Sequence, residues 1–247
     1  MANEKKTSVI IAAAGNASRF MVGRDTLVKL LSKQFVLLNG KPLLFHSLEK
    51  FLSLKDLFEI IIVTNDINST NKFLQEAGYS RNVQIKVVEG SKLRQDSVYN
   101  GFCKVDNSVD LVVIHDVARP LFEIKDLEKC IETALVSGAA VLAVPVVDTV
   151  KCAKSDKDRL IVKNTLDRNE LFLIQTPQVF SYNLLSRGYK MLMNSDLKQV
   201  ITDEASMIEI LGEEVELVSG NRTNIKITYP EDLKVSEAIL DSRICLV

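Results

Sequence analysis

Short apolar segments alternate with helix-like segments along the N-terminal part of the chain. The apolar segments are predicted strands at 8–13, 59–64, 84–88, 110–114 and 139–144. Apolar residues at helical spacing predict the helices between them, at 42–51, 68–77, 96–103 and 124–136. Strands that are apolar at every position are buried on both faces, which is typical of a parallel sheet covered by helices on both sides. The alternation therefore predicts an α/β fold with a doubly wound, mostly parallel sheet.

The stretch 148–166 interrupts this alternation. Two strand-like arms, 149–152 and 160–162, flank a charged turn at 154–158 and predict a β-hairpin that protrudes from the body of the fold. A lone hairpin is only marginally stable in water. We therefore favour an arm that packs against a second copy of the chain over a flexible surface flap.

The C-terminal part returns to the α/β pattern. Thr202 or Asp203 is a suitable N-cap for a helix, because short polar side chains accept hydrogen bonds from the first turn. Short strands are predicted at 215–218 and 225–228, and Pro230 suits the first turn of the last helix.

Composition narrows the class of protein. The 247 residues carry a formal net charge of −1, so no bulk charge draws the chain to nucleic acid or to an anionic membrane. The 4 cysteines are scattered and there are only 2 histidines, which argues against a disulfide framework or a zinc site. We find neither a signal peptide nor an apolar run long enough to cross a bilayer, and expect a cytoplasmic protein. Without repeats or linkers, residues 1–247 are interpreted as one domain with 148–168 as a dimerisation arm.

Small residues follow the first predicted strand, in the sequence Ala-Ala-Ala-Gly-Asn-Ala-Ser-Arg. Backbone N–H groups at Ala13, Ala14 and Gly15 suit a phosphate, because small side chains let an anion approach. Arg19 and Lys33 add two cations that suit the charge of a phosphoryl-transfer transition state. The stretch matches neither a Walker A loop nor GxGxxG. The alternative is a plain strand end with two surface cations.

Polar residues also follow other predicted strands, and the carboxyl ends of parallel strands meet at one edge of the sheet. Asp116 follows the strand at 110–114 and is a hard oxygen ligand suited to Mg²⁺, while Arg119 can bind a phosphate. The alternative is that Asp116 caps the turn and pairs with Arg119.

Two further stretches carry candidate ligand contacts. The loop that begins at Gly90 and Ser91 enters a helix and offers Arg94 and Ser97 for contacts with a base or a ribose. Lys226 is a cation within an apolar stretch, so its side chain points either to solvent or into a site.

Taken together, these stretches resemble the 2-C-methyl-D-erythritol 4-phosphate cytidylyltransferase family of the non-mevalonate isoprenoid pathway. The resemblance covers nearly the whole chain and rests on several motifs in order: AAAG with a later arginine, KQF, LRQDSV, HDVARP, PVVDTVK, LDRNELFLIQTPQVF, TDEAS and SGNRTNIKIT. It implies a Rossmann-like nucleotidyltransferase fold. It also implies a CTP-dependent transferase that gives CDP-methylerythritol and pyrophosphate from CTP and 2-C-methyl-D-erythritol 4-phosphate.

The resemblance implies a role for each candidate residue. The catalytic cations would be Arg19, Lys33 and Lys226. The nucleotide-binding residues would be Ala13, Ala14, Gly15, Gly90, Ser91, Arg94 and Ser97. Asp116 would hold Mg²⁺ or another hard divalent cation. The polyol phosphate would be bound by Arg119, Thr149 and Arg168. Because Thr149 and Arg168 flank the hairpin, the family's arm-exchanged homodimer would build each substrate site from two chains.

The chain departs from the family pattern at three places. Ala17, preceded by Asn16, stands where the first loop usually has a second glycine, and Ser91 stands where a second glycine is common in the later loop. Ser32 replaces the usual proline before Lys33. Loss of glycine can exclude positive φ or crowd a ligand, so we expect adjusted geometry at these loops.

Three alternatives remain open from the sequence. A cytidylyltransferase for another polyol phosphate, such as ribitol 5-phosphate, would share most motifs, although the stretches at 167–169 and 202–206 favour the methylerythritol branch. The departures from the glycine pattern motivate a degenerate, non-catalytic nucleotide-binding protein, against which the retained set of cations and carboxylate argues. A nicotinamide-dependent dehydrogenase has the least support.

Overall fold

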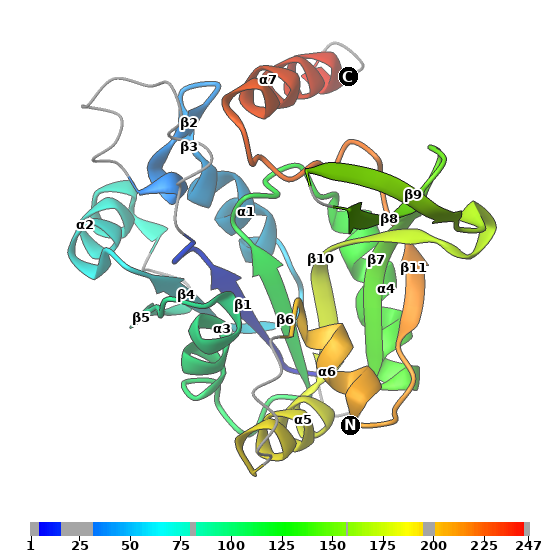
Figure 1. Ribbon diagram of the computed structural model, residues 1–247. Helices are drawn as coiled ribbons and strands as arrows, with labels where there is room; N and C mark the ends of the chain where they lie inside the picture. The colour runs from blue at the N-terminus through cyan, green and yellow to red at the C-terminus, as the bar shows by residue number, and fades with distance from the viewer. Residues whose placement is uncertain (1–4, 16–31, 80–82, 157, 195–200, 245–247) are drawn as a thin grey trace.

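The structure, a computed structural model, describes residues 5–15, 32–79, 83–156, 158–194 and 201–244. Arg19 and the departure at Asn16 and Ala17 lie outside the described residues. The described chain forms a seven-stranded sheet in the order β11-β7-β10-β6-β1-β4-β5 (Figure 1). Its strands are β1 (Thr7–Ala12), β4 (Leu57–Thr64), β5 (Gln84–Glu89), β6 (Leu111–Asp116), β7 (Ala139–Pro145), β10 (Phe172–Ser181) and β11 (Glu216–Ser219).

Helices cover both faces of this sheet. One apolar cluster joins the sheet to α1 (Leu43–Leu52), α2 (Ile67–Ala77) and α4 (Ile124–Ser137). A second cluster joins the opposite face to α3 (Arg94–Phe102), α5 (Tyr182–Asn194) and α6 (Glu204–Ile210). Within β1, Val9 and Ile11 belong to the first cluster and Ile10 to the second, and all three are fully buried. A strand between two helical layers must be apolar on both sides, so the predicted doubly wound α/β fold is confirmed.

The predicted helix and strand boundaries mostly agree with the structure to within a few residues. Gly78 ends α2 in the left-handed conformation, with φ of 75°, as its place after the helix predicts. Asp203, and not Thr202, is the N-cap of α6, because its side chain accepts from the Ser206 N–H. The last helix, α7 (Pro230–Ile244), begins at the predicted proline.

Strand β10 was not predicted. It runs antiparallel to both β6 and β7, so the sheet is mixed, with the parallel strands in the majority. Its interior contains Pro177, which normally argues against a strand because proline cannot donate to the ladder. Here the register with β7 shifts between Ile174 and Gln178, so the proline lies in an irregular part of the pairing.

Two local predictions were wrong. The stretch 225–228 is not a strand. The Ile227 N–H donates to the Ala118 carbonyl at 2.8 Å, so the stretch is held by the loop after β6 and does not pair with a strand of the sheet. The hairpin turn is shorter than predicted, because β8 (Lys151–Asp156) and β9 (Arg159–Thr165) pair as far as Asp156 and Arg159. A polar sequence does not prevent pairing in a hairpin whose two faces are largely exposed.

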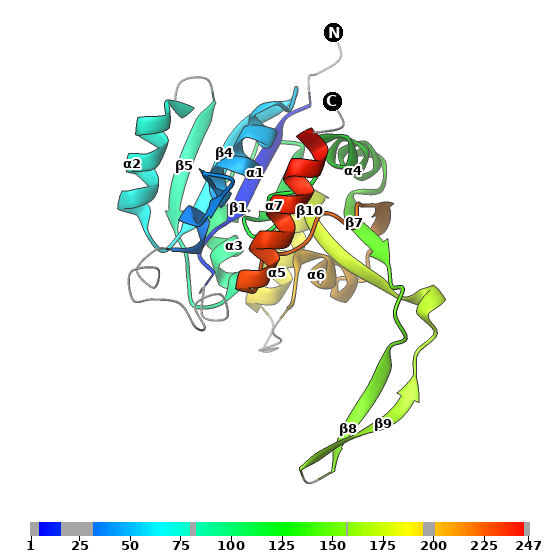
Figure 2. The ribbon, with the colours of Figure 1, turned by 90° about the horizontal axis from the view of Figure 1, so that it is seen from above.

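The hairpin extends well beyond the sheet and the helices around it (Figure 2). The remaining short elements are β2 (Leu37–Leu38), β3 (Lys41–Pro42) and the 3₁₀ turns η2 (Lys33–Phe35) and η4 (Arg168–Glu170). Within the described ranges, no helix combines the length and apolar character that a bilayer crossing requires.

His115 on β6 is a fully buried link between layers. Its ring nitrogens form hydrogen bonds with the Ser47 hydroxyl of α1 and the Thr176 hydroxyl of β10, each at 3.2 Å. Burial lowers the pKa of His115 to about 3, because an apolar environment disfavours the imidazolium ion. The folded protein therefore keeps this histidine neutral near pH 7.

We predict that this histidine makes the fold acid-sensitive. The unfolded chain takes up a proton at His115 below its ordinary pKa of 6.5, whereas the folded chain does so only near 3. The stabilising contribution is complete above the unfolded pKa and is lost as pH falls through this window, by about 1.4 kcal/mol per pH unit. Urea unfolding at several pH values should show a smaller slope of stability against pH for His115→Asn than for wild type. Equal slopes would contradict the prediction.

Candidate active site

Two adjoining cavities open at the carboxyl ends of the parallel strands. The larger, of about 330 Å³, is lined by the end of β1, Lys33, the loop after β5 and the end of β6 with the two residues that follow it. The smaller, of about 150 Å³, is lined by β10 and the segment before α6. Arg94, Asp116 and Lys226 line both cavities, and we call these three residues the shared wall. Their position agrees with the rule that ligands bind at this edge of an α/β sheet.

The turn after β1 forms one side of the larger cavity, which Ala13, Ala14 and Gly15 line. The Ala13 N–H donates to the Val63 carbonyl at 2.8 Å, so this amide belongs to the sheet. The Asn65 side chain donates to the Ala14 carbonyl at 2.8 Å and holds the turn in place. Among the described residues, nothing accepts from the N–H groups of Ala14 and Gly15, so these two amides remain for an anion.

The loop after β5 lies against this turn. A Cβ atom at Gly90 would lie 2.1 Å from the Cβ of Ala14, so only glycine fits. The Ser97 hydroxyl accepts from the Ser91 N–H at 2.8 Å, so this predicted nucleotide contact also holds the loop. Asn39 is the only described non-glycine residue with positive φ. Ser91 therefore adopts a conformation open to any residue, and the loss of the usual glycine causes no backbone strain.

The segment 32–35 presents Lys33 to the larger cavity. Ser32 has φ of −60°, the value to which a proline ring is restricted, so the backbone expected for the family's proline is kept. Gln34 donates to the Thr64 hydroxyl at 2.7 Å, and the ring of Phe35 packs on Phe73 with centroids 4.7 Å apart. These contacts anchor the turn at the end of β4.

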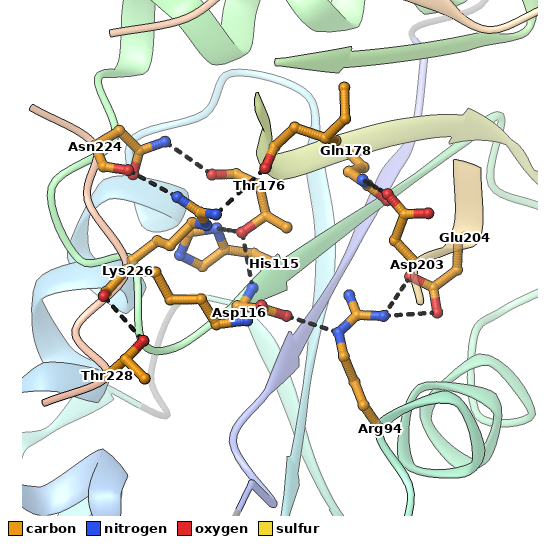
Figure 3. Close-up of polar contacts among 12 residues, drawn as sticks. Arg94, His115, Asp116, Thr176, Gln178, Asp203, Glu204, Asn224, Lys226 and Thr228 are labelled. Atoms are coloured by element: carbon orange, nitrogen blue, oxygen red, sulfur yellow. Dashed lines mark hydrogen bonds and ion pairs between the residues drawn. The ribbon is translucent and has the colours of Figure 1, made fainter. Parts of the chain in front are cut away.

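Asp116 is the centre of an ion-pair network in the shared wall (Figure 3). Its Oδ1 accepts from Arg94 Nε at 2.9 Å, and its Oδ2 accepts from Lys226 Nζ at 2.6 Å. Burial raises the pKa of Asp116, but the charges of Arg94 and Lys226 outweigh it and hold the pKa well below its usual range. Asp116 does not pair with Arg119 as the alternative interpretation required.

Several supporting residues were missed by the sequence analysis. The Thr176 hydroxyl accepts from the Asp116 N–H at 3.0 Å, and the Asn224 side chain donates to the Thr176 carbonyl at 3.0 Å (Figure 3). Gln178 donates to Asp203 at 2.8 Å. Their motifs, TPQVF and SGNRTNIKIT, contributed to the resemblance, but no local pattern showed that these residues meet at this edge.

Arg119 lies in the smaller cavity only. Its guanidinium donates to the backbone carbonyls of Asn224 and Ile174, at 2.9 and 3.3 Å, while its buried Nε atom has no partner among the described residues. Thr149 and Arg168 line neither cavity. Arg168 is at the base of the hairpin and donates to the Val147 carbonyl at 3.0 Å.

The residues present suit a metal that is held mainly by its nucleotide. No group of three or more histidine, cysteine or carboxylate side chains gathers in the described chain. Mg²⁺, however, is commonly bound by one or two carboxylates together with substrate phosphates and water. Asp116 supplies one such carboxylate beside the larger cavity, and a metal would bind there alongside its ion pairs with Arg94 and Lys226 or in place of one of them.

Comparisons with known proteins agree with this geometry. The family model for 2-C-methyl-D-erythritol 4-phosphate cytidylyltransferase matches residues 7–242. The enzyme of that name from Alkaliphilus oremlandii is 39% identical over 98% of this chain and 98% of its own length. The chloroplastic enzyme of that name from Oryza sativa is 38% identical over 97% of this chain and 76% of its own length.

Solved structures resemble the fold as a whole. The crystal structure of 4-diphosphocytidyl-2C-methyl-D-erythritol synthase from Anaerococcus prevotii superposes with a TM-score of 0.79 at 29% identity, covering 96% of this chain and 97% of that one. The cytidylyltransferase structure from Thermus thermophilus gives a TM-score of 0.72 at 29% identity, covering 95% and 98% of the two chains.

We predict that the contact between Gly90 and Ala14 is essential for the larger cavity. Gly90→Ala should destabilise the fold by about 1–3 kcal/mol, because the new methyl group forces the loop away from the turn. The measurement is thermal unfolding, with Ser91→Gly as the control at the neighbouring position. A Gly90→Ala melting temperature equal to that of wild type would show that the loop shifts without cost.

Proposed function

The chain belongs to the 2-C-methyl-D-erythritol 4-phosphate cytidylyltransferase family, and from this membership we propose how its two cavities divide the reaction. The enzyme transfers the cytidylyl group of CTP to 2-C-methyl-D-erythritol 4-phosphate, giving CDP-methylerythritol and pyrophosphate for isoprenoid biosynthesis. In this proposal the larger cavity binds CTP and the smaller cavity binds the polyol phosphate. The observation that carries it is the shared wall, since its residues line both cavities where the reacting groups must meet.

The residues act by positioning and by charge stabilisation. The N–H groups of Ala14 and Gly15, which have no acceptor among the described residues, bind phosphate oxygens of CTP beside Lys33. A phosphate oxygen of the polyol phosphate attacks the α-phosphorus in line, and the bond to the bridging oxygen of the β-phosphate breaks as pyrophosphate leaves. Lys33 and Lys226 offset the negative charge that develops, and Asp116 holds the Lys226 ammonium in place at 2.6 Å. No covalent enzyme intermediate is required.

Two further participants belong to the proposal. Arg19 is a third cation for the triphosphate, by resemblance. Asp116 would hold Mg²⁺ together with phosphate oxygens and water, and the metal would supply charge neutralisation on those phosphates. The proposed compartment is the cytoplasm, with which the free thiols of Cys103, Cys130 and Cys152 agree.

A homodimer completes the site in this proposal. The hairpin exposes two large apolar side chains of β9, with Leu160 81% and Val162 58% exposed. Apolar surface on a protruding arm favours a covering partner, and a second copy of the chain is the simplest one. Because Thr149 and Arg168 lie outside the cavities of their own chain, we propose that they reach the polyol phosphate bound by the partner.

The assay for the proposed function is pyrophosphate release from CTP and Mg²⁺, with methylerythritol phosphate and ribitol 5-phosphate tested side by side. Turnover with methylerythritol phosphate is expected. Turnover with ribitol phosphate alone would overturn the substrate assignment, and none with either would favour a non-catalytic nucleotide-binding protein.

We predict that Lys33→Ala lowers kcat by about a hundredfold or more while the fold remains intact, since it removes a cation from the developing charge. Lys72→Ala, at an exposed position on α2, is the matched control and should keep wild-type turnover. A near-normal kcat for Lys33→Ala would remove Lys33 from the catalytic residues.

We predict that two inactive variants complement each other. Arg168→Ala and Lys33→Ala should each be inactive alone. In a mixed dimer, one site contains both substitutions and the other contains neither, so remixed chains should recover about a quarter of wild-type activity. Sedimentation measures the dimer in the same samples. A monomer, or a mixture that stays inactive although mixed dimers form, would contradict the shared site.

A further inference from the structure

Glu204, the first residue of α6, is fully buried beside the shared wall. Both of its carboxylate oxygens accept from Arg94 Nη1, at 3.2 and 2.9 Å. Figure 3 shows the Arg94 guanidinium between Glu204 on one side and Asp116 on the other. Glu204 itself lines neither cavity, so a ligand in them meets Arg94 and not this carboxylate.

The contacts divide the edges of the guanidinium between the two carboxylates. Nη1 binds Glu204, and Nε binds Oδ1 of Asp116 at 2.9 Å. Oδ2 of Asp116 is thereby left to Lys226, at 2.6 Å. Burial lowers the pKa of Arg94, but the charges of Glu204 and Asp116 outweigh it, so the guanidinium stays charged. Burial raises the pKa of Glu204, and the charge of Arg94 opposes this rise. With both carboxylates ionised, the four groups carry two positive and two negative charges.

The position of Glu204 is itself rigid. Asp203, the residue before it, caps α6 through the Ser206 N–H at 3.0 Å and accepts from Gln178 of β10 at 2.8 Å. On the apolar side, Ala205 and Met207 belong to the buried cluster that joins α6 to α3 and α5. A buried carboxylate held in this way gives Arg94 a fixed acceptor that water cannot replace.

Without the charge on Glu204, the Arg94 guanidinium would no longer be shared between two carboxylates. Arg94 would then have Asp116 as its one remaining counter-ion in the wall, and it would be free to turn two of its nitrogens toward this carboxylate. A bidentate pair is the preferred geometry of arginine and carboxylate. Such a pair would draw Asp116 Oδ2 away from Lys226 and displace the ammonium from the place where the two cavities meet.

We propose that Glu204 is a positioning residue for cytidylyl transfer, which orients Arg94 so that Asp116 can hold Lys226 at the junction of the cavities. The inference rests on the proposed function. It adds to the proposed mechanism a residue that does not touch substrate and that acts through the shared wall.

The test compares Glu204→Gln with wild type and a matched control. Glu204→Gln keeps the size of the side chain and removes its charge. We expect kcat to fall by about tenfold to a hundredfold, because small displacements at a reacting centre have effects of this size. The KM for CTP should change less than kcat does, since Ala14, Gly15 and Ser97 keep their places in the larger cavity. Glu204→Asp restores the charge and should recover part of the lost kcat.

Glu59→Gln is the control for simple loss of a buried carboxylate. Glu59 is also fully buried and pairs with Lys86 at 2.6 Å, but it lines neither cavity. We expect Glu59→Gln to lower the melting temperature while keeping wild-type kcat. Equal kcat for Glu204→Gln and wild type, or an equal loss in the Glu59 variant, would overturn the inference.

Two further outcomes are decided by the same set. Should Glu204→Gln fail to fold, Glu204→Asp decides alone. Its shorter side chain withdraws the carboxylate from Arg94 and should lower kcat, and a kcat equal to that of wild type overturns the inference. Should wild type itself release no pyrophosphate with methylerythritol phosphate, the proposed function fails, and the inference fails with it. If wild type and Glu204→Gln have the same kcat, the proposed function stands, and only the positioning role of Glu204 is rejected.

Discussion

The buried carboxylate of Asp116 organises the functional edge of this protein, because two cations from distant parts of the chain converge on it. Arg94 comes from the start of α3 and Lys226 from the segment before α7. A charge with 8% exposure is costly unless it is paired, and pairing both oxygens fixes the cations as firmly as the carboxylate. The same contacts that lower the cost of burial therefore build the wall between the two cavities.

Hydrogen bonds from neighbouring strands and loops hold Asp116 in place. The Thr176 hydroxyl accepts from the Asp116 N–H and hydrogen-bonds to the neutral ring of His115, which in turn reaches Ser47 on α1. Asn224 joins the strand that contains Thr176 to the segment that carries Lys226. These bonds connect the helical layer that contains α1 to the site, so the position of the charges depends on how this layer packs on the sheet.

The departures from the family pattern that the structure describes are compatible with a working site. Ser32 keeps the φ of the proline it replaces, and Lys33 still lines the larger cavity. Ser91 needs no positive φ, and its N–H is bound by the Ser97 hydroxyl. The strict requirement for glycine lies one residue earlier, at Gly90, where the loop touches the turn after β1. Local geometry, and not the number of glycines, decides whether this loop closes.

The sequence alone predicted the doubly wound α/β fold, because β1, β4 and β6 are apolar on both faces and only a sheet between two helical layers buries such strands. It also predicted the edge that carries the site, since parallel strands end together. It failed at β10, where Pro177 opposes a strand locally and the pairing with two neighbours outweighs it. It failed at 225–228 because a strand requires a partner that local preference does not reveal.

The functional contacts also divide into those that the sequence indicates and those that only the fold decides. Asp116, Lys226 and Arg94 were candidates from their residue types and their motifs, but their mutual pairing required the folded chain. Arg94 and Glu204 are separated by 110 positions, and only the packing of α6 beside α3 places them within hydrogen-bond distance. Backbone preferences and apolar periodicity depend on near neighbours and are therefore readable in sequence. Ion pairs between buried side chains depend on how whole elements pack, and only the tertiary structure decides them.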